Sequence, residues 1–369
     1  MATIIQVCLS SNCGGLEIYI ERISRALSHR GHRVQVVTLA GTYLSQRLPA
    51  EINYPIKTHG IGDAARFSLG ISNRILAENA DVVHVHGGRE LPFAVLAKLR
   101  FRRRMRLVYS RHIVLNRSKK DLWHRVLYRH VDAYLAVSEQ IREQALRRVP
   151  IPSERVHFLH HGMELPANEP DARALARAKL GFRDNCFLVG SFSRIELAKG
   201  QHTLIEAVSL LRKKAVDVQA FIMGHVSEAA YGEHLTRLVR ELQLDAHVIF
   251  LDFVPDAHRL MSACDAVVVP SKQEGFGLVV IEAMAAGIPV IGTRGAGGML
   301  NLMEHEKNGL LFDWEDAAML AQQLEALYQD PDLRARLGCN GRSLVERHFS
   351  LEDHLNALEN HFFGHAASG

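Results

Sequence analysis

Short apolar runs alternate with helical segments along nearly the whole chain, and no other feature restricts its fold so strongly. The runs are rich in Val, Ile and Ala and apolar throughout, which is typical of strands buried on both faces of a parallel sheet. The segment between the first two runs places Leu16, Ile20, Ile23 and Leu27 on one helical face. The sequence therefore predicts an α/β fold of doubly wound, Rossmann-like sheets. The predicted strands are residues 4–9, 34–39, 82–86, 107–110, 133–137 and 156–159, then 186–190, 218–224, 247–251, 266–270, 289–292 and 309–312.

Two such domains are predicted in tandem. The 369 residues exceed the usual size of one compact domain, and two prolines interrupt the alternation in LPANEP, at residues 165–170. We expect an N-terminal domain at residues 1–165, completed by a C-terminal helix at residues 346–369, and a second domain at residues 166–345. A cleft between them would bring the carboxyl ends of both sheets to one ligand.

The composition excludes several classes of protein. Hydrophobic residues make up 47% and charged residues 23% of the chain, which excludes disordered, collagen-like and mucin-like proteins. No apolar stretch reaches the length of a membrane-spanning helix, and the N-terminal MATIIQVCLSS lacks the basic region of a signal peptide. The five cysteines form no CxxC pair, which favours a reducing compartment. We therefore expect a cytoplasmic protein.

Charge is divided unevenly along the chain. Residues 1–165 hold 25 Lys and Arg against 13 Asp and Glu, whereas residues 166–369 hold 19 against 27. A basic first half and an acidic second half indicate different partners for the two halves.

The first candidate site follows the predicted strand at residues 186–190, in GSFSRIELAKG. Arg194 and Lys199 lie in this loop, and Gly200 precedes the next helix. Two cations at a strand-to-helix turn suit a diphosphate, because the helix N-terminus adds free N–H groups and partial positive charge. The alternative is that both cations are solvated loop residues.

The second candidate site is the segment PSKQEGFGLVVIEAMAAGIPVIG. Gly275 and Gly277 allow backbone N–H groups to approach an anion or a sugar hydroxyl closely. Glu274 and Glu282 are eight residues apart, about two helical turns, so both carboxylates can face one ligand. Alternatively, Glu274 is only a helix N-terminal carboxylate and Glu282 a solvated one, but the apolar neighbours of Glu282 favour a functional role.

The first half offers weaker signals. Gly14 and Gly15 follow the first strand and open the first helix, without the GxGxxG pattern of a nicotinamide site. His112 follows the strand at residues 107–110, and His84 and His86 belong to VVHVHG. Among 21 histidines, any one is more often a packing or surface residue than a catalytic one.

Together, GGLE near the N-terminus, VVHVHG, Arg194 with Lys199-Gly200, and EGFGLVVIEAMAAGIPVIG resemble glycosyltransferase family 4, over nearly the whole chain. The pair Glu274 and Glu282 is the most specific part of this likeness. The resemblance implies the GT-B architecture, in which two Rossmann-like domains face each other across a cleft. It further implies a retaining transfer of a sugar from a nucleotide diphosphate donor, of the bacterial lipopolysaccharide or cell-envelope type, with a UDP-sugar as the commonest expectation.

The resemblance also implies roles for individual residues. Arg194 and Lys199 would hold the diphosphate and stabilise the leaving group, Glu274 would hold the donor sugar, and Glu282 would bind the ribose. His112 would lie by the donor sugar and the reacting carbon. The remaining residues implied in donor binding are Gly14, Gly15, Phe253, Val254, Gly275, Phe276, Gly277 and Leu278.

Enzymes of this type are thought to react on one face of the sugar, with the leaving phosphate helping to deprotonate the acceptor. The resemblance thus implies no metal and no cofactor. The one DxD, Asp330-Pro331-Asp332, fits the start of a helix rather than a Mg²⁺ site. The chain departs from the family at His160-His161-Gly162, where Asn-Gly is frequent, and at Ala198.

Acceptor choice is expected in the first domain. Its basic region at residues 98–125 contains KLRFRRRMR, RSKKDLWHR and Trp123. Such a region can be a solvated helix end or bind nucleic acid, anionic lipid or an acidic glycan. Nucleic acid fits a nucleotide-sugar enzyme poorly. We expect a peripheral position on the cytoplasmic face of the inner membrane, with a glycolipid or lipopolysaccharide-core acceptor.

Two other functions stay open at this point. A nucleotide-sugar epimerase shares the two-domain architecture and would turn over donor without any acceptor. A non-enzymatic nucleotide-sugar-binding partner is the third possibility, against which the complete set of Arg194, Lys199, Glu274 and Glu282 argues.

Overall fold

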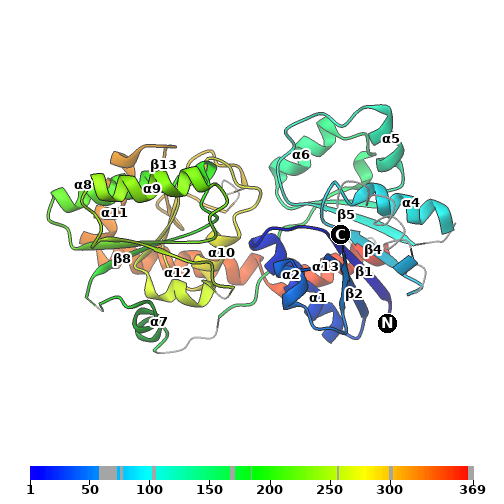
Figure 1. Ribbon diagram of the computed structural model, residues 1–369, viewed down its shortest axis with the longest axis horizontal. Coiled ribbons are helices and arrows are strands. Elements are labelled where there is room, and N and C mark those ends of the chain that lie inside the picture. Colours follow the sequence, from blue (N-terminus) through cyan, green and yellow to red (C-terminus); the bar gives the residue numbers. More distant parts are fainter. Residues whose placement is uncertain are drawn as a thin grey trace. The chain divides into compact units, whose positions relative to one another are not determined.

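The computed structural model describes residues 1–57, 73–74, 78–101, 105–166, 171–183, 185–255, 257–298 and 302–364. It divides into two compact units, one formed by Met1–Gly162 with Leu351–Gly369 and the other by Met163–Ser350 (Figure 1). Each unit contains one parallel sheet with helices on both faces, so the predicted α/β, doubly wound class is confirmed. Most of the expected linker, residues 167–170, lies outside the described residues.

The first unit contains a seven-stranded sheet in the order β3-β2-β1-β4-β5-β6-β7. All neighbouring strands run parallel. Its strands are β1 (Thr3–Cys8), β2 (Arg33–Leu39), β3 (Asn53–Ile56), β4 (Val82–Val85), β5 (Arg106–Arg111), β6 (Ala133–Ala136) and β7 (Val156–Phe158). The sequence pattern missed β3, because NYPI at the edge of the sheet is only half-buried and carries a proline.

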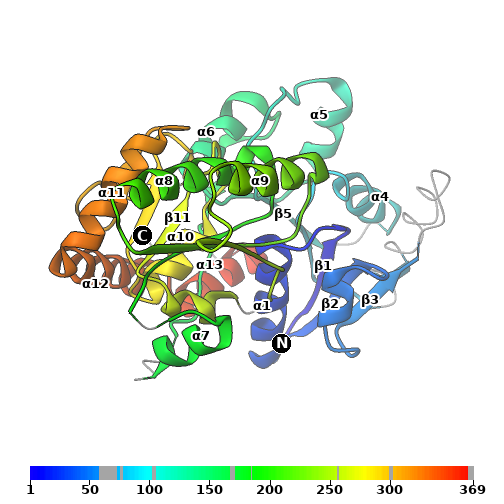
Figure 2. The same cartoon turned by 60° about the vertical axis from the view of Figure 1, so that its left-hand side comes forward.

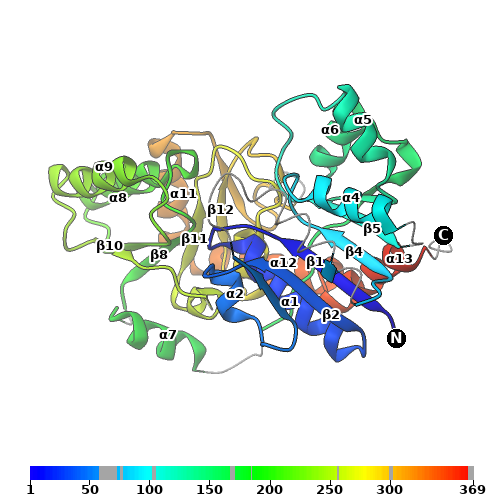
Figure 3. The same cartoon turned by 45° about the vertical axis from the view of Figure 1, so that its right-hand side comes forward.

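The helices of the first unit include one from the far end of the chain. They are α1 (Gly15–His29), α2 (Tyr43–Arg47), α4 (Leu91–Phe101), α5 (Leu122–Arg129), α6 (Glu139–Arg148) and α13 (Leu351–Phe363), with a short 3-10 turn, η2 (Ser153–Arg155). Leu358 and Phe362 of α13 pack into the same core as Ile20 and Leu27 of α1. Figure 3 shows α13, in red, among the elements of the first unit. This burial returns the end of the chain to the first sheet.

The second unit contains a six-stranded parallel sheet in the order β10-β9-β8-β11-β12-β13. Its strands are β8 (Phe187–Phe192), β9 (Val218–Met223), β10 (Val248–Leu251), β11 (Ala266–Val269), β12 (Val290–Thr293) and β13 (Leu310–Phe312). Its helices are α7 (Ala172–Leu180), η3 (Leu197–Lys199), α8 (Gln201–Lys213), α9 (Ala229–Glu241), η4 (Ala257–Ala263), α10 (Leu278–Ala285), α11 (Ala317–Gln329) and α12 (Pro331–His348). Apolar residues of α8, α9 and α11 share one core with the sheet. Figure 2 shows these three helices beside the sheet of this unit.

A buried arginine of α7 forms an ion pair with an aspartate next to the second sheet. The side chain of Arg177 is fully buried, and its guanidinium donates to Asp265 Oδ2 at 2.7 Å and to the carbonyl of Ala263 at 2.9 Å. Asp265 Oδ2 also accepts from the backbone N–H of Leu188 at 2.8 Å. The buried charge is therefore paired and hydrogen-bonded, which is the condition for keeping it inside.

Candidate active site

The predicted charged residues of the second unit lie at the point where its strand order reverses. From the central strand β8 the sheet grows to one side through β9 and β10 and to the other through β11, β12 and β13. Arg194 and Lys199 lie in the connection after β8, and Glu274 in the connection after β11. Open parallel sheets bind ligands beyond the carboxyl ends of the strands at such a point.

Backbone hydrogen bonds join the loops after β8, β9, β11 and β12 with one another and with the end of β10. The bonds run from Ser193 N to Met223 O at 3.1 Å, from Ile195 N to His225 O at 2.8 Å, from Gly224 N to Leu251 O at 3.1 Å, from Lys272 N to Ala198 O at 2.9 Å and from Glu274 N to Ala296 O at 2.6 Å. The loops are therefore mutually braced, which suits a site that must hold its groups in place.

Gly200 allows two of these loops to touch. Its φ is +66°, in the left-handed region, and a Cβ at this position would lie 2.2 Å from the carbonyl oxygen of Pro270. Only glycine meets both conditions without strain. Gly277, with φ of +97°, similarly precedes α10, where its carbonyl accepts from Val280 N at 2.9 Å and no side chain caps the helix.

Lys199 and Glu274 form an ion pair in the site. Lys199 Nζ donates to Glu274 Oε1 at 2.7 Å, and each side chain is 15% exposed. The cation predicted to bind a diphosphate thus contacts the carboxylate predicted to bind the sugar. An anion bound by Lys199 would compete with Glu274 for this charge-assisted hydrogen bond.

Arg194 is the more exposed cation. Its guanidinium pairs with Glu196 at 3.0 Å, and its side chain is 38% exposed. The loop below it is held by Gln201, whose buried amide donates to Ser193 Oγ at 2.9 Å and to the carbonyl of Arg194 at 2.8 Å. The sequence analysis missed Gln201, although a glutamine directly after the loop glycine, in the first turn of a helix, was the available signal.

The structure places the remaining predicted residues of the second unit as follows. Gly275, Phe276, Gly277 and Leu278 form the turn into α10, where the Phe276 ring is buried 6.0 Å from that of Phe349. Glu282 lies one turn further along α10 and is half-buried. Phe253 and Val254 are half-buried in the loop after β10, and the Val254 carbonyl accepts from Ala257 N at 3.2 Å.

In the first unit, the corresponding reversal lies between β1 and β4. Gly14 is the extended residue before α1, with φ of −178°, and Gly15 is the first residue of the helix. His86 follows β4, and His112 follows β5. The predicted residues of this unit therefore lie at the carboxyl end of its sheet.

His112, which is half-buried, contacts the buried His86 and His161 in a cluster that the sequence did not bring together. His86 Nδ1 lies 3.2 Å from His112 Nε2, and His112 Nδ1 lies 3.4 Å from His161 Nε2. Desolvation of the ring by burial, with the charge of Arg111 nearby, lowers the pKa of His112 to about 3. Burial also holds the pKa of His86 and of His161 well below the ordinary value. All three are therefore neutral at physiological pH.

The DxD segment begins a helix, as predicted. Asp330 caps α12 by accepting from Leu333 N at 2.9 Å, with Pro331 in the first turn. Among the described residues, no group of three or more His, Cys, Asp or Glu is arranged to hold a metal ion.

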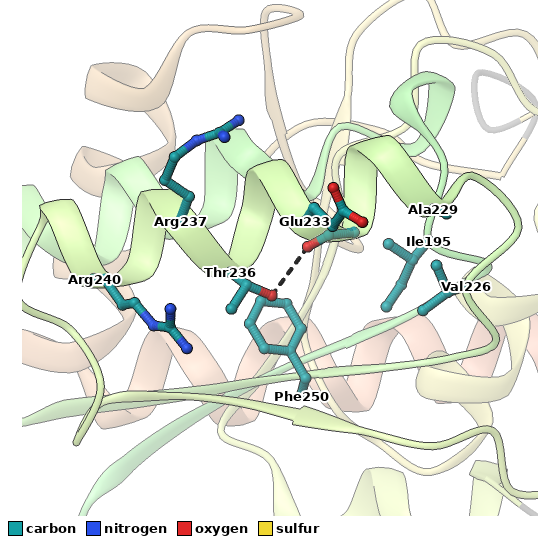
Figure 4. Close-up of a pocket in the computed structure, with 9 residues that line it drawn as sticks. Ile195, Val226, Ala229, Glu233, Thr236, Arg237, Arg240 and Phe250 are labelled. Carbon is teal, nitrogen blue, oxygen red and sulfur yellow. Dashed lines mark hydrogen bonds between the residues drawn. The ribbon is translucent and has the colours of Figure 1, made fainter.

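A pocket of about 680 Å³ lies next to the charged loops, between α9 and the edge strand β10 (Figure 4). Ile195, Val226 and Phe250 form its apolar side, and Glu233, Arg237 and Arg240 project from α9. None of the predicted site residues lines this pocket, although Ile195 directly follows Arg194.

The basic region of the first unit is described only in part. Arg102, Arg103 and Arg104 lie outside the described residues. In α5, Leu122, Trp123 and Val126 are 79%, 60% and 52% exposed. No helix in the described part of the chain is long and apolar enough to cross a membrane.

Family models match both halves of the chain. The model of group 1 glycosyl transferases matches residues 172–344, and the model of glycosyltransferase family 4 matches residues 13–165. One relative, the D-inositol 3-phosphate glycosyltransferase of Pseudarthrobacter chlorophenolicus, is 35% identical over 189 residues. The match covers 50% of this chain and 44% of that relative, so it spans less than half of the relative's length.

Solved structures share the fold over the whole chain. HepE of Anabaena in complex with UDP-glucose is 24% identical, with a TM-score of 0.87 over 99% of this chain and 100% of that one. WaaG, a glycosyltransferase involved in lipopolysaccharide biosynthesis, is 21% identical, with a TM-score of 0.74 over 98% of this chain and 100% of that one. Each unit thus has the Rossmann-like architecture of GT-B glycosyltransferases. Two adjoining segments of the chain are thus similar to glycosyltransferases, residues 13–165 to family 4 and residues 172–344 to group 1, so the chain is GT4-like over most of its length.

Proposed function

We propose that the protein is a retaining glycosyltransferase that moves a sugar, a hexose or a related one, from a UDP-sugar to an acceptor hydroxyl. The observation that carries the proposal is the set of Arg194, Lys199 and Glu274 on braced loops at the strand-order reversal of the second sheet. The names of the relatives support it, since one transfers a sugar to inositol phosphate and a structural neighbour binds UDP-glucose.

In this proposal, the second unit supplies fixed positive charge for the diphosphate. Arg194 and Lys199 lie in the connection that leads into α8, and Lys199 contacts Glu274 in the connection that leads into α10. Charge builds up on the phosphate as the glycosidic bond breaks, and cations already in place stabilise it without reorganisation. Glu282 would bind the ribose, and Glu274 would bind the sugar once Lys199 turns to the phosphate.

We propose further that the chemistry needs no metal. With two cations at the leaving group, the phosphate itself would take the proton of the acceptor hydroxyl on the face where the bond breaks, and the configuration at the reacting carbon would be retained.

The test compares Arg194→Ala with Arg183→Ala. Both arginines are exposed and paired with a carboxylate, Arg183 with Asp217 at 3.4 Å, but only Arg194 belongs to the proposed site. We expect UDP to raise the melting temperature of the wild type and of Arg183→Ala, and not of Arg194→Ala. Stabilisation by NAD and by no nucleoside diphosphate would contradict the proposal.

Product analysis separates the alternative functions. A transferase releases UDP only as it glycosylates an acceptor or water, and NMR of the product gives the anomeric configuration. An epimerase would convert the UDP-sugar to its epimer without release of UDP, and a non-enzymatic binding protein would leave it intact. Inversion at the anomeric carbon would contradict the retaining mechanism, and loss of activity in EDTA would contradict metal independence.

We also propose that the first unit binds an anionic membrane surface, where a glycolipid or lipopolysaccharide-core acceptor is found. Leu122, Trp123 and Val126 form an exposed apolar face on α5. The exposed cations Arg117, Lys120, Arg125 and Arg129 lie within the same segment. Apolar side chains that enter the headgroup layer and cations worth about 1 kcal/mol each near anionic lipid are the usual ingredients of peripheral binding. The similarity to WaaG supports this acceptor class.

Liposome co-sedimentation tests the membrane proposal. We expect binding to vesicles of phosphatidylcholine with phosphatidylglycerol, weaker binding to phosphatidylcholine alone, and loss of binding in Trp123→Ala with Val126→Ala. Leu175→Ala is the matched control, because Leu175 is 63% exposed on α7 in the second unit. Equal binding to both vesicle types, or equal effects of the two sets of variants, would rule the proposal out.

A further inference from the structure

A continuous hydrogen-bond chain of neutral side chains crosses the first unit from β1 to the end of β7. Gln6 of β1 bonds to His86 after β4, His86 to His112 after β5, and His112 to His161 after β7. The heavy-atom distances along it are 2.7, 3.2 and 3.4 Å. Gln6, His86 and His161 are at most 3% exposed, whereas His112 is only half-buried. His112 is thus the one member of the chain with a side toward solvent.

The position of Gln6 sets the direction of this chain. The Gln6 amide Nε2 donates to Ser24 Oγ at 3.0 Å, which leaves Oε1 facing His86 as an acceptor. His86 Nε2 must therefore carry a proton, and since the ring is neutral, His86 Nδ1 is an acceptor. His112 Nε2 then donates to His86 Nδ1, and His112 Nδ1 is left as an acceptor. Each step follows from the step before it.

Aromatic packing keeps the rings in this arrangement. The Tyr19 ring lies edge-on to His161 with centroids 4.0 Å apart and 5.6 Å from that of His112, and its hydroxyl bonds to His354 Nε2 at 2.9 Å. The rings of His112 and His161 are stacked, 18° from parallel. A protonated imidazole in this dry surrounding would lack a counter-charge, which keeps the chain neutral.

We propose that Gln6 and His86 are positioning residues that fix His112 as the Nε2–H tautomer, so that His112 Nδ1 accepts a hydrogen bond from a substrate hydroxyl. The proposal rests on the proposed function. The substrate hydroxyl takes the place of His161, whose 3.4 Å contact is the longest in the chain. His112 therefore recognises a group that can donate a hydrogen bond and discriminates against one that can only accept.

The tautomer is measured first, on ligand-free full-length protein. Histidine-selective ¹⁵N labelling with long-range ¹H–¹⁵N correlation distinguishes protonated from unprotonated ring nitrogens, and His112→Asn identifies the signals of His112. We expect a protonated Nε2 and an unprotonated Nδ1 for His112 at pH 7.5. In Gln6→Leu, both His86 and His112 should become mixtures of tautomers. A protonated Nδ1 on His112 in the wild type overturns the proposal.

The matched control is Ser110→Ala. Ser110 is buried in the same cluster and bonds to His84 Nε2 at 2.8 Å, outside the chain from Gln6 to His161. Gln6→Leu removes two buried hydrogen bonds, to Ser24 and to His86, and Ser110→Ala removes one in the same cluster, to His84. Ser110→Ala should leave the His112 tautomer and the specificity described next unchanged. Equal effects of the two variants would show a merely structural role for Gln6.

Donor and acceptor analogues test recognition. Single hydroxyls of the sugars that support transfer are replaced by hydrogen or by fluorine, which accepts a hydrogen bond weakly and cannot donate one. At the hydroxyl that His112 contacts, we expect replacement by hydrogen and replacement by fluorine each to lower kcat/KM of the wild type by about 5- to 10-fold. In Gln6→Leu, where the His112 tautomer is no longer fixed, the same replacements should lower kcat/KM by about 2-fold or less. If fluorine restores activity where hydrogen does not, His112 donates and the proposal is wrong.

The two measurements separate failure of this proposal from failure of the proposed function. The spectrum needs no turnover, so a wrong tautomer overturns the positioning role even in an active transferase. Absence of any transfer, with the expected tautomer in place, overturns the proposed function and with it the hydroxyl recognition.

Discussion

The two units place contrasting chemistry at equivalent points of the same fold. At the reversal of the second sheet, Arg194 and the ion pair of Lys199 with Glu274 lie partly exposed on loops. Beyond the first sheet, the corresponding groups are neutral imidazoles removed from water. The difference does not follow the net charge of the two halves, since the acidic half carries both site cations, each paired with a carboxylate, and the basic half carries neutral imidazoles. Net charge thus describes surfaces and long-range attraction, while individual side chains define a site.

The contrast also holds for the interiors of the two units. In the second unit the fully buried Arg177 is charged and compensated by Asp265. In the first unit the buried imidazoles are neutral, so they need no carboxylate as a counter-charge. The three predictions below test this comparison.

The largest effect is expected from Arg177→Ala, which leaves Asp265 buried and without its closest cation. We expect a loss of about 3–5 kcal/mol in the free energy of unfolding, seen as an earlier transition of the second unit in urea. Arg173→Ala is the control, because Arg173 pairs with the same aspartate at 2.8 Å but is 46% exposed. It should cost about 1 kcal/mol or less. Equal losses would contradict a special role for burial.

The next effect is on activity. Glu274→Ala should lower the rate of sugar transfer by about 100-fold or more, because it removes a site carboxylate and frees Lys199. The thermal unfolding temperature should change little. Glu304→Ala is the control, since Glu304 forms an ion pair of the same 2.7 Å length with Lys307 on the surface. Full activity in Glu274→Ala would show that the sugar site is assigned to the wrong carboxylate.

The smallest effect per residue is on the pH dependence of stability. Burial lowers the pKa of His112 to about 3 and of His354 to about 4, from an ordinary 6.5. Between pH 6.5 and 4 the unfolded chain therefore binds protons that the folded first unit does not, so its stability is complete above pH 6.5 and falls with decreasing pH. At pH 5 we expect a loss of about 2 kcal/mol for each of these two histidines.

Urea unfolding at pH 7.5 and pH 5, followed by the fluorescence of Trp123 in the first unit and Trp314 in the second, measures this effect. The transition of the first unit should move to lower urea at pH 5 by more than that of the second. Equal shifts would show that the comparison between the two interiors does not hold.

The sequence predicted local features because their cause is local. Within the residues that the structure describes, apolar β-branched runs indicated twelve of the thirteen strands. The exception, β3, is a half-buried edge strand whose proline and polar residues hide its pattern. Asp330 before Pro331 indicated the start of α12, because helix capping also depends only on neighbouring residues. Spacing within single loops likewise brought Arg194, Lys199 and Glu274 to attention, although their roles remain proposals.

Only the tertiary structure decided which distant residues meet. His86, His112 and His161 come from loops after three different strands, and each alone looks like a common packing residue. Their hydrogen bonds arise because parallel strands end at one edge of a sheet, where residues 26 and 49 positions apart come into contact. The sequence by itself thus determined the class of fold and the charged loops, through local periodicity and turn chemistry. The neutral chain around His112 and the pairing of Lys199 with Glu274 depend on strand order, which no local pattern encodes.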